Sequence, residues 1–221
     1  LLLSFTRLPK GEAKRPVSEQ GRPLKAMIRT PAVFVPVLTG MASFSLMTFV
    51  MVAAPLAMVH LCGHAPADAA NAIQWHIVAM FAPSFVTGEI IKRIGTHLTV
   101  AIGMLLIIFS VGTALMGTTT FHFDLGLVLL GMGWNFGFIG STVLLTKSYR
   151  PEEGAKVQAL NEQLVFGSNA IGSIGAGLAL NFFGWEAVNL IALPIAVSAI
   201  LLLGWDDLRT RRIGRQALAS D

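Results

Sequence analysis

Charged residues fall into a few short clusters along the chain, and the stretches between these clusters are almost wholly hydrophobic. Each stretch reaches the roughly 20 residues that a helix needs to cross a bilayer. With the charge clusters and the Gly-, Pro- and Asp-rich joints taken as helix ends, the pattern predicts six transmembrane helices, at about 31–60, 71–92, 97–117, 122–147, 156–181 and 186–205. The short connections favour antiparallel neighbours.

The 16 Lys and Arg residues all fall on one side of this predicted topology. Seven precede the first helix, and the others lie between the second and third helices, between the fourth and fifth, and after the sixth. This positive-inside asymmetry predicts that both ends of the chain are cytoplasmic. Four aromatic residues are expected at the membrane interfaces, Trp75 and Trp185 at outer helix ends and Tyr149 and Trp205 at inner ends.

Composition supports a polytopic membrane protein and excludes a soluble domain. Hydrophobic residues make up 54% of the chain and charged residues 13%, and the mean hydropathy is +0.68. The single cysteine, Cys62, excludes an internal disulfide framework. The net charge is +4, but the basic residues lie at helix ends and are not interleaved with aromatic residues on one face. Their expected partner is therefore anionic membrane lipid and not nucleic acid.

The two ends of the chain predict segments outside the six-helix bundle. Residues 1–5 are an apolar stub without an initiator methionine, which predicts the end of a preceding helix in a longer protein. Together with the basic cytoplasmic loop that follows, they form a predicted first segment, 1–30. Thr30 and Pro31 are typical of an N-cap and a first helical position. The bundle is predicted over 31–206, and a basic cytoplasmic tail over 207–221.

Polar residues in the middle of the predicted helices are the candidates for substrate binding. Asn135 and Asn169 lie near the midpoints of two consecutive helices, and an unpaired amide in hydrocarbon costs several kcal/mol. Each therefore either binds substrate in a cavity or fixes helix packing through internal hydrogen bonds. Neighbouring aromatic and hydroxyl side chains would complete a cavity. The predicted lining consists of Asn135, Trp134, Phe138, Asn169, Phe166, Ser45 and Thr48.

Three ionisable residues are candidates for coupling or gating. Glu162 lies about 9 Å inside its helix from Lys156, so it is either a proton site, a gate salt bridge with Lys147 or Lys156, or an acid wetted at the interface. His76 is either a titrating group or a locally bonded interfacial histidine. Glu89 precedes Lys92 and Arg93 by three and four residues, which ordinary helical ion pairs also explain.

Small residues and one proline predict how the helices pack and bend. Pairs four residues apart, which let helix backbones approach closely, are Gly133 with Gly137, Ser168 with Gly172, and Ser173 with Gly177. Pro83 lies in the middle of the second predicted helix, so we expect a kink and a freed carbonyl group. Ser84 and Thr87 are the expected partners of that carbonyl.

The only metal-like cluster is HLCGHAPAD, with His60, Cys62, His64 and Asp68. Gly63 interrupts the helix between the two histidines, so they need not share a face, and no metal site is predicted. No nucleophile constellation, phosphate loop or cofactor motif is present either. The sequence therefore predicts that the protein is not an enzyme and binds no cofactor, and a membrane metalloprotein at this cluster stays as a minor alternative.

One loop resembles a known family pattern. The stretch GEIIKRIGTH, residues 88–97, resembles the major facilitator superfamily loop pattern G-x-x-x-D-R-x-G-R-R in its second-half version. Gly88, Arg93 and Gly95 match it, whereas Lys92 stands where the pattern has an acid and the final basic pair is absent. A leading helix stub, a basic linker and six spans also resemble the carboxy-terminal half of such a transporter.

The resemblance implies an all-α, 12-helix transporter of which this chain supplies helices 7 to 12. A missing N-terminal six-helix half would pack against it, and substrate would bind between the halves and be exposed to each side in turn. The first, second, fourth and fifth spans would then line the cavity, and the expected location is a bacterial inner membrane. No charged residue lies at mid-depth, which predicts a neutral or aromatic small-molecule substrate. Proton coupling stays open, and so does the alternative of a non-transporting membrane scaffold or receptor.

Overall fold

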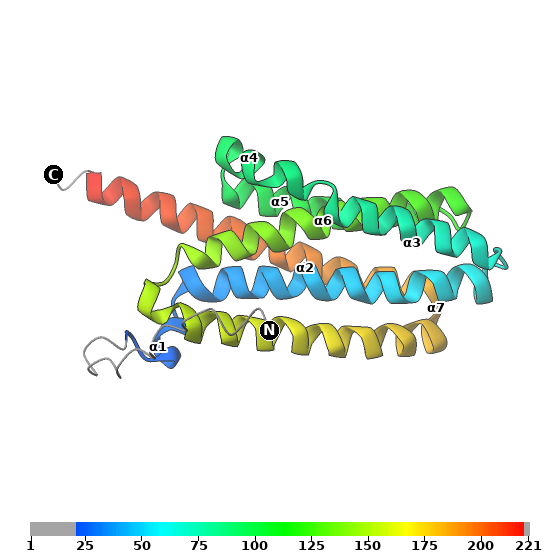
Figure 1. Cartoon of the computed structure of the whole chain (residues 1–221), viewed down its shortest axis with the longest axis horizontal. Helices are drawn as coiled ribbons and strands as arrows, with labels where there is room; N and C mark the ends of the chain where they lie inside the picture. Colours follow the sequence, from blue (N-terminus) through cyan, green and yellow to red (C-terminus); the bar gives the residue numbers. More distant parts are fainter. Residues whose placement is uncertain (1–20, 219–221) are drawn as a thin grey trace, which may run out of the picture.

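The computed structural model describes residues 21–218, which form a bundle of helices and contain no strand (Figure 1). Along the chain the elements are α1 (Leu24–Ile28), α2 (Pro31–Leu56), the π-helical η3 (Ala57–Leu61), α3 (Pro66–Phe81), α4 (Ser84–Ile94), α5 (Thr96–Met116), α6 (Thr120–Thr146), the 3-10 helix η4 (Pro151–Glu153) and α7 (Gly154–Leu218). The expected all-α fold is confirmed. The stub and most of the basic linker, residues 1–20, lie outside the described residues.

The long element α7 is two antiparallel helices joined at Gly184. That residue has φ 79° and ψ −177°, a conformation that L-residues with a side chain rarely adopt. The chain therefore reverses between residues 154–183 and 185–218, and the two limbs return to the same end of the bundle (Figure 1). The second limb continues as helix to Leu218, so the expected tail after residue 206 is helical.

Helix α3 and helix α4 form one broken rod, as Pro83 predicts. Pro83 has no N–H, and α3 ends at Phe81 before α4 begins at Ser84. Four segments of the described residues are long and apolar enough to cross a membrane, namely Pro31–Leu61, Thr96–Met116, Thr120–Thr146 and Pro151–Ile213. The last contains both limbs of α7, and α3 with α4 completes the set as a broken span. The helix ends agree with the six predicted ones to within about five residues, except that the last helix continues to Leu218 and not only to 205.

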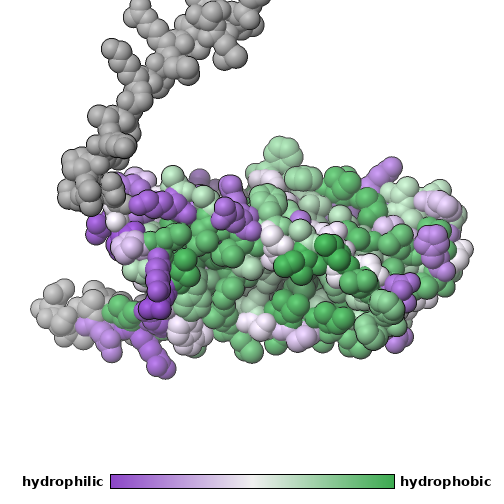
Figure 2. Space-filling view, turned by 90° about the horizontal axis from the view of Figure 1, so that it is seen from below, coloured by the Kyte–Doolittle hydropathy of each residue, from purple (hydrophilic) through white to green (hydrophobic). Residues whose placement is uncertain are grey.

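The helices lie in two layers. In Figure 1, α3 with α4, α6, α2 and residues 154–183 of α7 lie side by side on the near face, and α5 and residues 185–218 lie behind them. Most of the surface between the two ends is hydrophobic in the view of Figure 2. The chain is therefore an integral membrane protein by the length, composition and surface of its helices.

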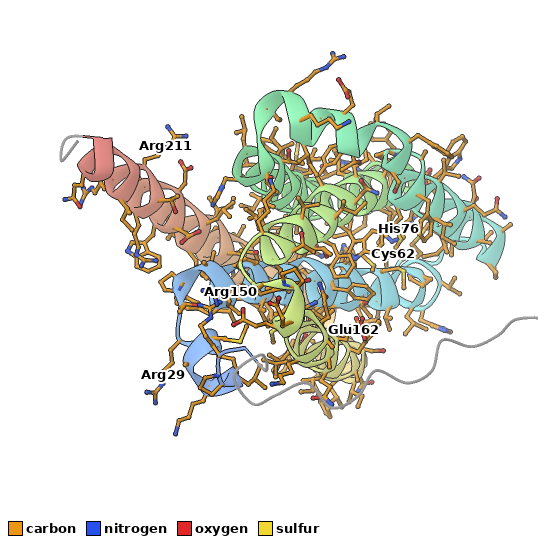
Figure 3. The ribbon with its side chains drawn as sticks, turned by 60° about the vertical axis from the view of Figure 1, so that its left-hand side comes forward. Arg29, Cys62, His76, Arg150, Glu162 and Arg211 are labelled. Atoms are coloured by element: carbon orange, nitrogen blue, oxygen red, sulfur yellow. The ribbon has the colours of Figure 1, made fainter. Side chains whose placement is uncertain are left out.

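Basic residues gather at one end of the bundle. Arg29, Arg150 and Arg211 come from three different segments of the chain, and Figure 3 shows all three on its left-hand side, spread apart from one another. Interfacial aromatic positions agree only in part, because Trp75 and Trp205 are about half exposed but Trp185 is buried against Phe123, with ring centroids 5.1 Å apart.

The start of α2 lies where Thr30 and Pro31 predict it. Thr30 is extended at the N-cap and Pro31 is the first helical residue. The Thr30 hydroxyl, however, donates to the carbonyl of Met27, 2.6 Å away, so it bonds to the end of α1 and not to α2. The short α1 is a departure from the expected irregular linker, and its Met27 is fully buried against Val33 and Val157.

Helices α5 and α6 pack closely, and glycines make this close packing possible. A Cβ added to Gly103 would lie 2.8 Å from the carbonyl oxygen of Gly133, and one added to Gly133 would lie 2.8 Å from that of Gly103. The predicted close packing at Gly133 and Gly137 is confirmed. Gly172 likewise packs against α2, whereas a Cβ on Gly177 would have open space, so close packing at Gly177 was wrong.

We expect Gly103→Ala to destabilise the protein by about 1–3 kcal/mol, because the added methyl group meets backbone that cannot move aside. Gly112→Ala is the matched control on the same helix, since its added Cβ meets nothing within 4 Å. Thermal unfolding of the two variants in detergent measures the difference. Equal unfolding temperatures for both variants would contradict a packed glycine seam.

A clasp at the basic end joins the segment before α1 to the connection between α6 and α7. The fully buried Glu153 carboxylate accepts hydrogen bonds from the Arg22 backbone N–H at 2.9 Å, its Nε at 2.9 Å and its Nη2 at 3.0 Å, and from the Arg150 N–H at 3.0 Å. This bonding raises the pKa of Arg22. Gly21, at φ 68°, fits beside it because a side chain there would overlap Glu153.

Glu153→Gln should open this clasp, because a neutral amide cannot replace the two-point ion pair with the guanidinium. We expect faster tryptic cleavage after Lys25, by roughly fivefold or more, in the purified protein at pH 7.5. The neighbouring exposed Glu152 offers the control, Glu152→Gln, which should leave the cleavage rate unchanged. Cleavage of both variants at the wild-type rate would show that the clasp does not hold this segment.

Candidate functional site

Four aromatic rings from three helices meet in the middle of the bundle. Phe44 of α2 is their centre, with ring centroids 5.6 Å from Trp134, 5.1 Å from Phe138 and 5.9 Å from Phe166. Trp134 and Phe138 of α6 are stacked, 5.6 Å apart with an interplanar angle of 11°. We call these four residues the aromatic cluster. The structure thus brings together the three aromatic residues predicted as cavity walls, Trp134, Phe138 and Phe166.

The aromatic cluster reaches the near face of Figure 1. Phe166 is 58% exposed, and Phe81 at the end of α3, 57% exposed, contacts Trp134 from the other side with centroids 6.0 Å apart. Trp134 itself is buried between them at 8% exposure. Exposed aromatic edges therefore flank a buried indole across the face that α3, α6, α2 and residues 154–183 form (Figure 1).

Local sequence explains why the rings converge. Trp134 and Phe138 are four residues apart on α6 and so lie one above the other on one helix face. Between them Gly137 lets α2 approach, because a Cβ there would overlap the Ser43 hydroxyl. This close approach places Phe44, the next residue along α2, over the rings of α6.

Three buried polar atoms around the aromatic cluster have no hydrogen-bond partner among residues 21–218. They are the Trp134 Nε1, the Ser43 Oγ and the Asn169 Oδ1. Asn169 lies about one turn beyond Phe166 on α7. A buried polar group without a partner is costly, so these atoms are places where a bound molecule can supply hydrogen bonds.

The other two predicted lining residues on α2 differ from each other. Ser45 donates to the Ser168 hydroxyl at 2.9 Å and so joins α2 to residues 154–183. Thr48 is 8% exposed, and its hydroxyl has only the Met47 sulfur nearby, at 4.0 Å. Ser45 follows Phe44 directly and Thr48 lies about one turn beyond it on α2, so both lie beside the aromatic cluster.

Asn135, in contrast, is fully buried and fully bonded inside the protein. Its Nδ2 donates to the Met80 carbonyl and to the Ser84 hydroxyl, both at 2.7 Å, and its Oδ1 accepts from Thr87 at 2.6 Å. The amide of α6 therefore bonds the backbone at the break between α3 and α4. These contacts fit the packing alternative for Asn135.

Thr87 and Ser84, the expected partners of the carbonyl freed by Pro83, also form hydrogen bonds at the helix break. The Thr87 hydroxyl also lies 2.8 Å from the Pro83 carbonyl, and its one proton can serve only one acceptor at a time. Ser84 bonds to Asn135 and not directly to a freed carbonyl. Sequence reasoning named both hydroxyls but did not connect them with the amide on α6.

The three candidate coupling residues lie apart from one another. His76 is fully buried, its Nδ1 donates to the Leu127 carbonyl at 2.7 Å, and its Nε2 has no partner among the described residues (Figure 3). Glu162 is exposed on α7, while Lys147, one of its suggested partners, donates to Thr96 at 3.0 Å. Glu89 forms an exposed helical ion pair with Arg93 at 2.9 Å.

The loop with the family pattern forms the tight turn between α4 and α5. Gly95 has φ 86° and ends α4, and Gly88, Lys92 and Arg93 are exposed on the last turns of that helix. His97 stands where the family pattern has the second residue of its final basic pair. Its Nε2 lies 3.3 Å from the Asp206 carboxylate of α7. This contact joins the turn to the second limb of α7.

The histidine and cysteine cluster at the opposite end is bonded to backbone. His64 Nε2 lies 2.7 Å from the Thr118 carbonyl, and the Asp68 carboxylate accepts from the Ala65 N–H at 3.2 Å. Within residues 21–218 no three His, Cys, Asp or Glu side chains are placed to hold a metal ion.

Two members of the site, Phe44 and Phe81, are not in the predicted lining, although Phe44 is one of the mid-depth residues of the first predicted helix that could line a cavity. Phe44 lies at the same depth as the predicted residues, but α2 is hydrophobic on all sides, so nothing in its sequence marks which face meets α6. Phe81 precedes the helix break, and the predicted kink at Pro83 is the one sequence signal near it.

We expect Asn135→Ala to lower the unfolding free energy by about 1–3 kcal/mol, because it leaves the Met80 carbonyl and the Ser84 hydroxyl oxygen without their donor in the membrane interior. Asn169→Ala provides the comparison, since the oxygen that it removes has no partner. Unfolding in detergent measures both. A larger loss for Asn169→Ala than for Asn135→Ala would refute the proposed support of the helix break.

Comparison with known proteins places this geometry in a family. The Major Facilitator Superfamily profile matches residues 37–217. The riboflavin transporter RfnT of Brucella anthropi is 43% identical over 203 residues, which is 91% of this chain and 51% of that protein. The uncharacterized MFS-type transporters YdeG and YddS of Bacillus subtilis are 32% and 31% identical, over 72% of this chain and 37% and 36% of their own lengths. No solved structure matches the chain.

The chain therefore spans about half the length of RfnT and just over a third of the two Bacillus proteins. The family profile covers nearly all of the helical bundle, from the first turns of α2 almost to the end of α7. The suspected family resemblance is confirmed: the chain belongs to the Major Facilitator Superfamily.

Proposed function

We propose that this chain is the C-terminal six-helix half of a secondary transporter that carries a planar aromatic solute of the riboflavin class. The aromatic cluster is the observation that carries this proposal. It presents ring faces and edges at the middle of the bundle, beside the buried and unpaired Nε1 of Trp134. The 43% identity to a riboflavin transporter supports the choice of solute.

The chemistry of a flavin ring matches these side chains. Its three fused rings are flat and stack on aromatic faces, as nucleobases do. Its outer ring carries alternating carbonyl groups and an N–H. The Trp134 N–H can donate to such a carbonyl, and the Asn169 oxygen can accept from such an N–H. A neutral ring system requires no charged partner at mid-depth.

The family and the exposed face of this half support transport by alternating access. Helix α3 and the first limb of α7 expose large aromatic side chains, among them Phe81 and Phe166, which a preceding half would cover. The substrate would then lie between the aromatic cluster and that half. The proposed orientation has the basic end in the cytoplasm and the protein in a bacterial inner membrane.

Coupling is assigned within this proposal to two residues on different helices. Glu162 is exposed on the first limb of α7, between the basic end and the aromatic cluster. His76 is buried beside α6 with one ring nitrogen unpaired. Either side chain can bind a proton at its present position. Glu89, in contrast, already forms an ion pair with Arg93 on the surface.

Uptake of labelled riboflavin by the complete gene product in liposomes tests the proposal. We expect Phe166→Ala to raise KM about tenfold, the effect of losing one stacking ring, with little change in protein stability because the ring is 58% exposed. Phe109→Ala is the matched control. Phe109 is 59% exposed, but it lies on α5, away from the aromatic cluster.

Two outcomes would count against the proposal. If the wild-type protein accumulates no riboflavin and no other flat-ring compound competes, the substrate class is wrong. If Phe109→Ala and Phe166→Ala change KM equally, the aromatic cluster does not contact the substrate.

A further inference from the structure

A second feature of the bundle, independent of the aromatic cluster, is a groove between α2 and the two limbs of α7. It encloses about 710 Å³, within the range of about 300–1,000 Å³ that ligand sites occupy. Its lining is hydrophobic apart from three serines. Figure 2 views the bundle from the side of residues 154–183, where most of the surface is hydrophobic.

The groove is about as deep as one leaflet of a bilayer. Its lining runs from Leu38 to Phe49 on α2 and from Ile191 to Leu202 on α7, about 16 Å of helix in each case. That is roughly half of a 30 Å hydrocarbon core. Leu38 and Leu202 lie nearest the basic end and Phe49 and Gly175 farthest from it, so the groove begins in the leaflet at the basic end and reaches past the middle of the bundle.

The serines of the groove do not call for a polar ligand. Ser45 donates to Ser168 at 2.9 Å, Ser168 to the Val165 carbonyl at 2.9 Å, and Ser198 to the Ile195 carbonyl at 2.9 Å. Each hydroxyl therefore already has an acceptor, and what faces the groove is hydrocarbon. An occupant that fits this lining is an apolar chain.

The groove continues into a basic stripe outside the hydrophobic span. Ser198, Leu202, Trp205, Arg209 and Arg212 follow one another at intervals of four, three, four and three residues, so they share one face of the second limb of α7. Its first two members line the groove. The last three therefore lie beyond its open end, where the helix leaves the bundle (Figure 1).

The arginines of this stripe are available to an anion. The Arg209 guanidinium lies 5.9 Å over the Trp205 ring, which stacks on Phe34 of α2 at 6.3 Å. Neither Arg209 nor Arg212 has an ion-pair partner among the described residues. Their neighbour Arg211, on another face of the helix, is paired with Asp207 at 2.9 Å.

We propose that the groove and this stripe together form a binding site for one anionic phospholipid of the leaflet at the basic end. The acyl chains fill the groove between α2 and α7. The phosphate lies at Arg209 and Arg212, and Trp205 lies at the level of the headgroup, where indoles are favoured. An apolar groove about one leaflet long, with two cations beyond its open end that have no ion-pair partner among residues 21–218, matches the two parts of such a lipid.

The test uses the complete gene product, purified in uncharged detergent and titrated with phosphatidylglycerol or with phosphatidylcholine of the same acyl chains. Bound lipid is counted by native mass spectrometry. We expect saturable binding of phosphatidylglycerol, at least about fivefold tighter than phosphatidylcholine. Arg212→Gln should weaken phosphatidylglycerol about fivefold and leave phosphatidylcholine unchanged. The matched Arg211→Gln removes the same charge from the adjacent, paired position and should change neither.

A groove variant tests the position of the acyl chains. Ile195 lines the groove and is 44% exposed, so Ile195→Trp fills the groove without disturbing the core, and we expect both lipids to bind more weakly. The proposal is overturned if Arg211→Gln and Arg212→Gln act alike, if Ile195→Trp leaves binding intact, or if neither lipid binds saturably. If neither lipid binds saturably and Ile195→Trp also destabilises the lipid-free protein, another helix covers the groove.

Discussion

The requirement that every backbone N–H and C=O find a partner inside the membrane governs this bundle, and it is hardest to meet at the break between α3 and α4. The protein meets it there with a side chain from another helix. Asn135 of α6 bonds the Met80 carbonyl at 2.7 Å and holds Ser84 and Thr87 around it. The break thereby attaches α6 to the α3–α4 rod at mid-depth. It also fixes the rotation of α6, because three bonds to one amide leave that helix few other orientations.

The rotation of α6 decides what the adjacent residue can do. Trp134 and Asn135 are neighbours and point about 100° apart. With Asn135 turned into the helix break, Trp134 faces the cluster around Phe44. The glycines of α6 then bring α5 and α2 close from the remaining sides. Different faces of α6 thus bond the broken backbone of the α3–α4 rod, pack closely against α5 and α2, and carry the rings of the aromatic cluster. A substitution that rotates α6 would therefore affect all three contacts.

The sequence pattern predicted where the transmembrane helices lie along the chain, but not which face of each helix meets its neighbours. Charge clusters and hydrophobic lengths located six helices, Pro83 located the break, and the depth of Trp134, Phe138 and Phe166 brought them into one site. Helices that are hydrophobic all round carry no periodic signal for their orientation. The sequence therefore left two roles open for Asn135 and gave no reason to select Phe44. The same limit made Trp185 look interfacial when it packs on Phe123.

The two limbs of α7 show how one continuous apolar sequence acquires two different surfaces. The first limb places Phe166 and Asn169 at the aromatic cluster on one side and small residues such as Gly172 against α2 on another. The second limb reverses at Gly184 and returns along α2, so that a groove remains between the limbs. Because hydrocarbon lipid chains can fill such a groove at no cost in hydrogen bonds, the bundle need not close it. The first limb stays attached to α2 beside the groove, because Ser45 donates to the Ser168 hydroxyl and Gly172 packs against the α2 backbone.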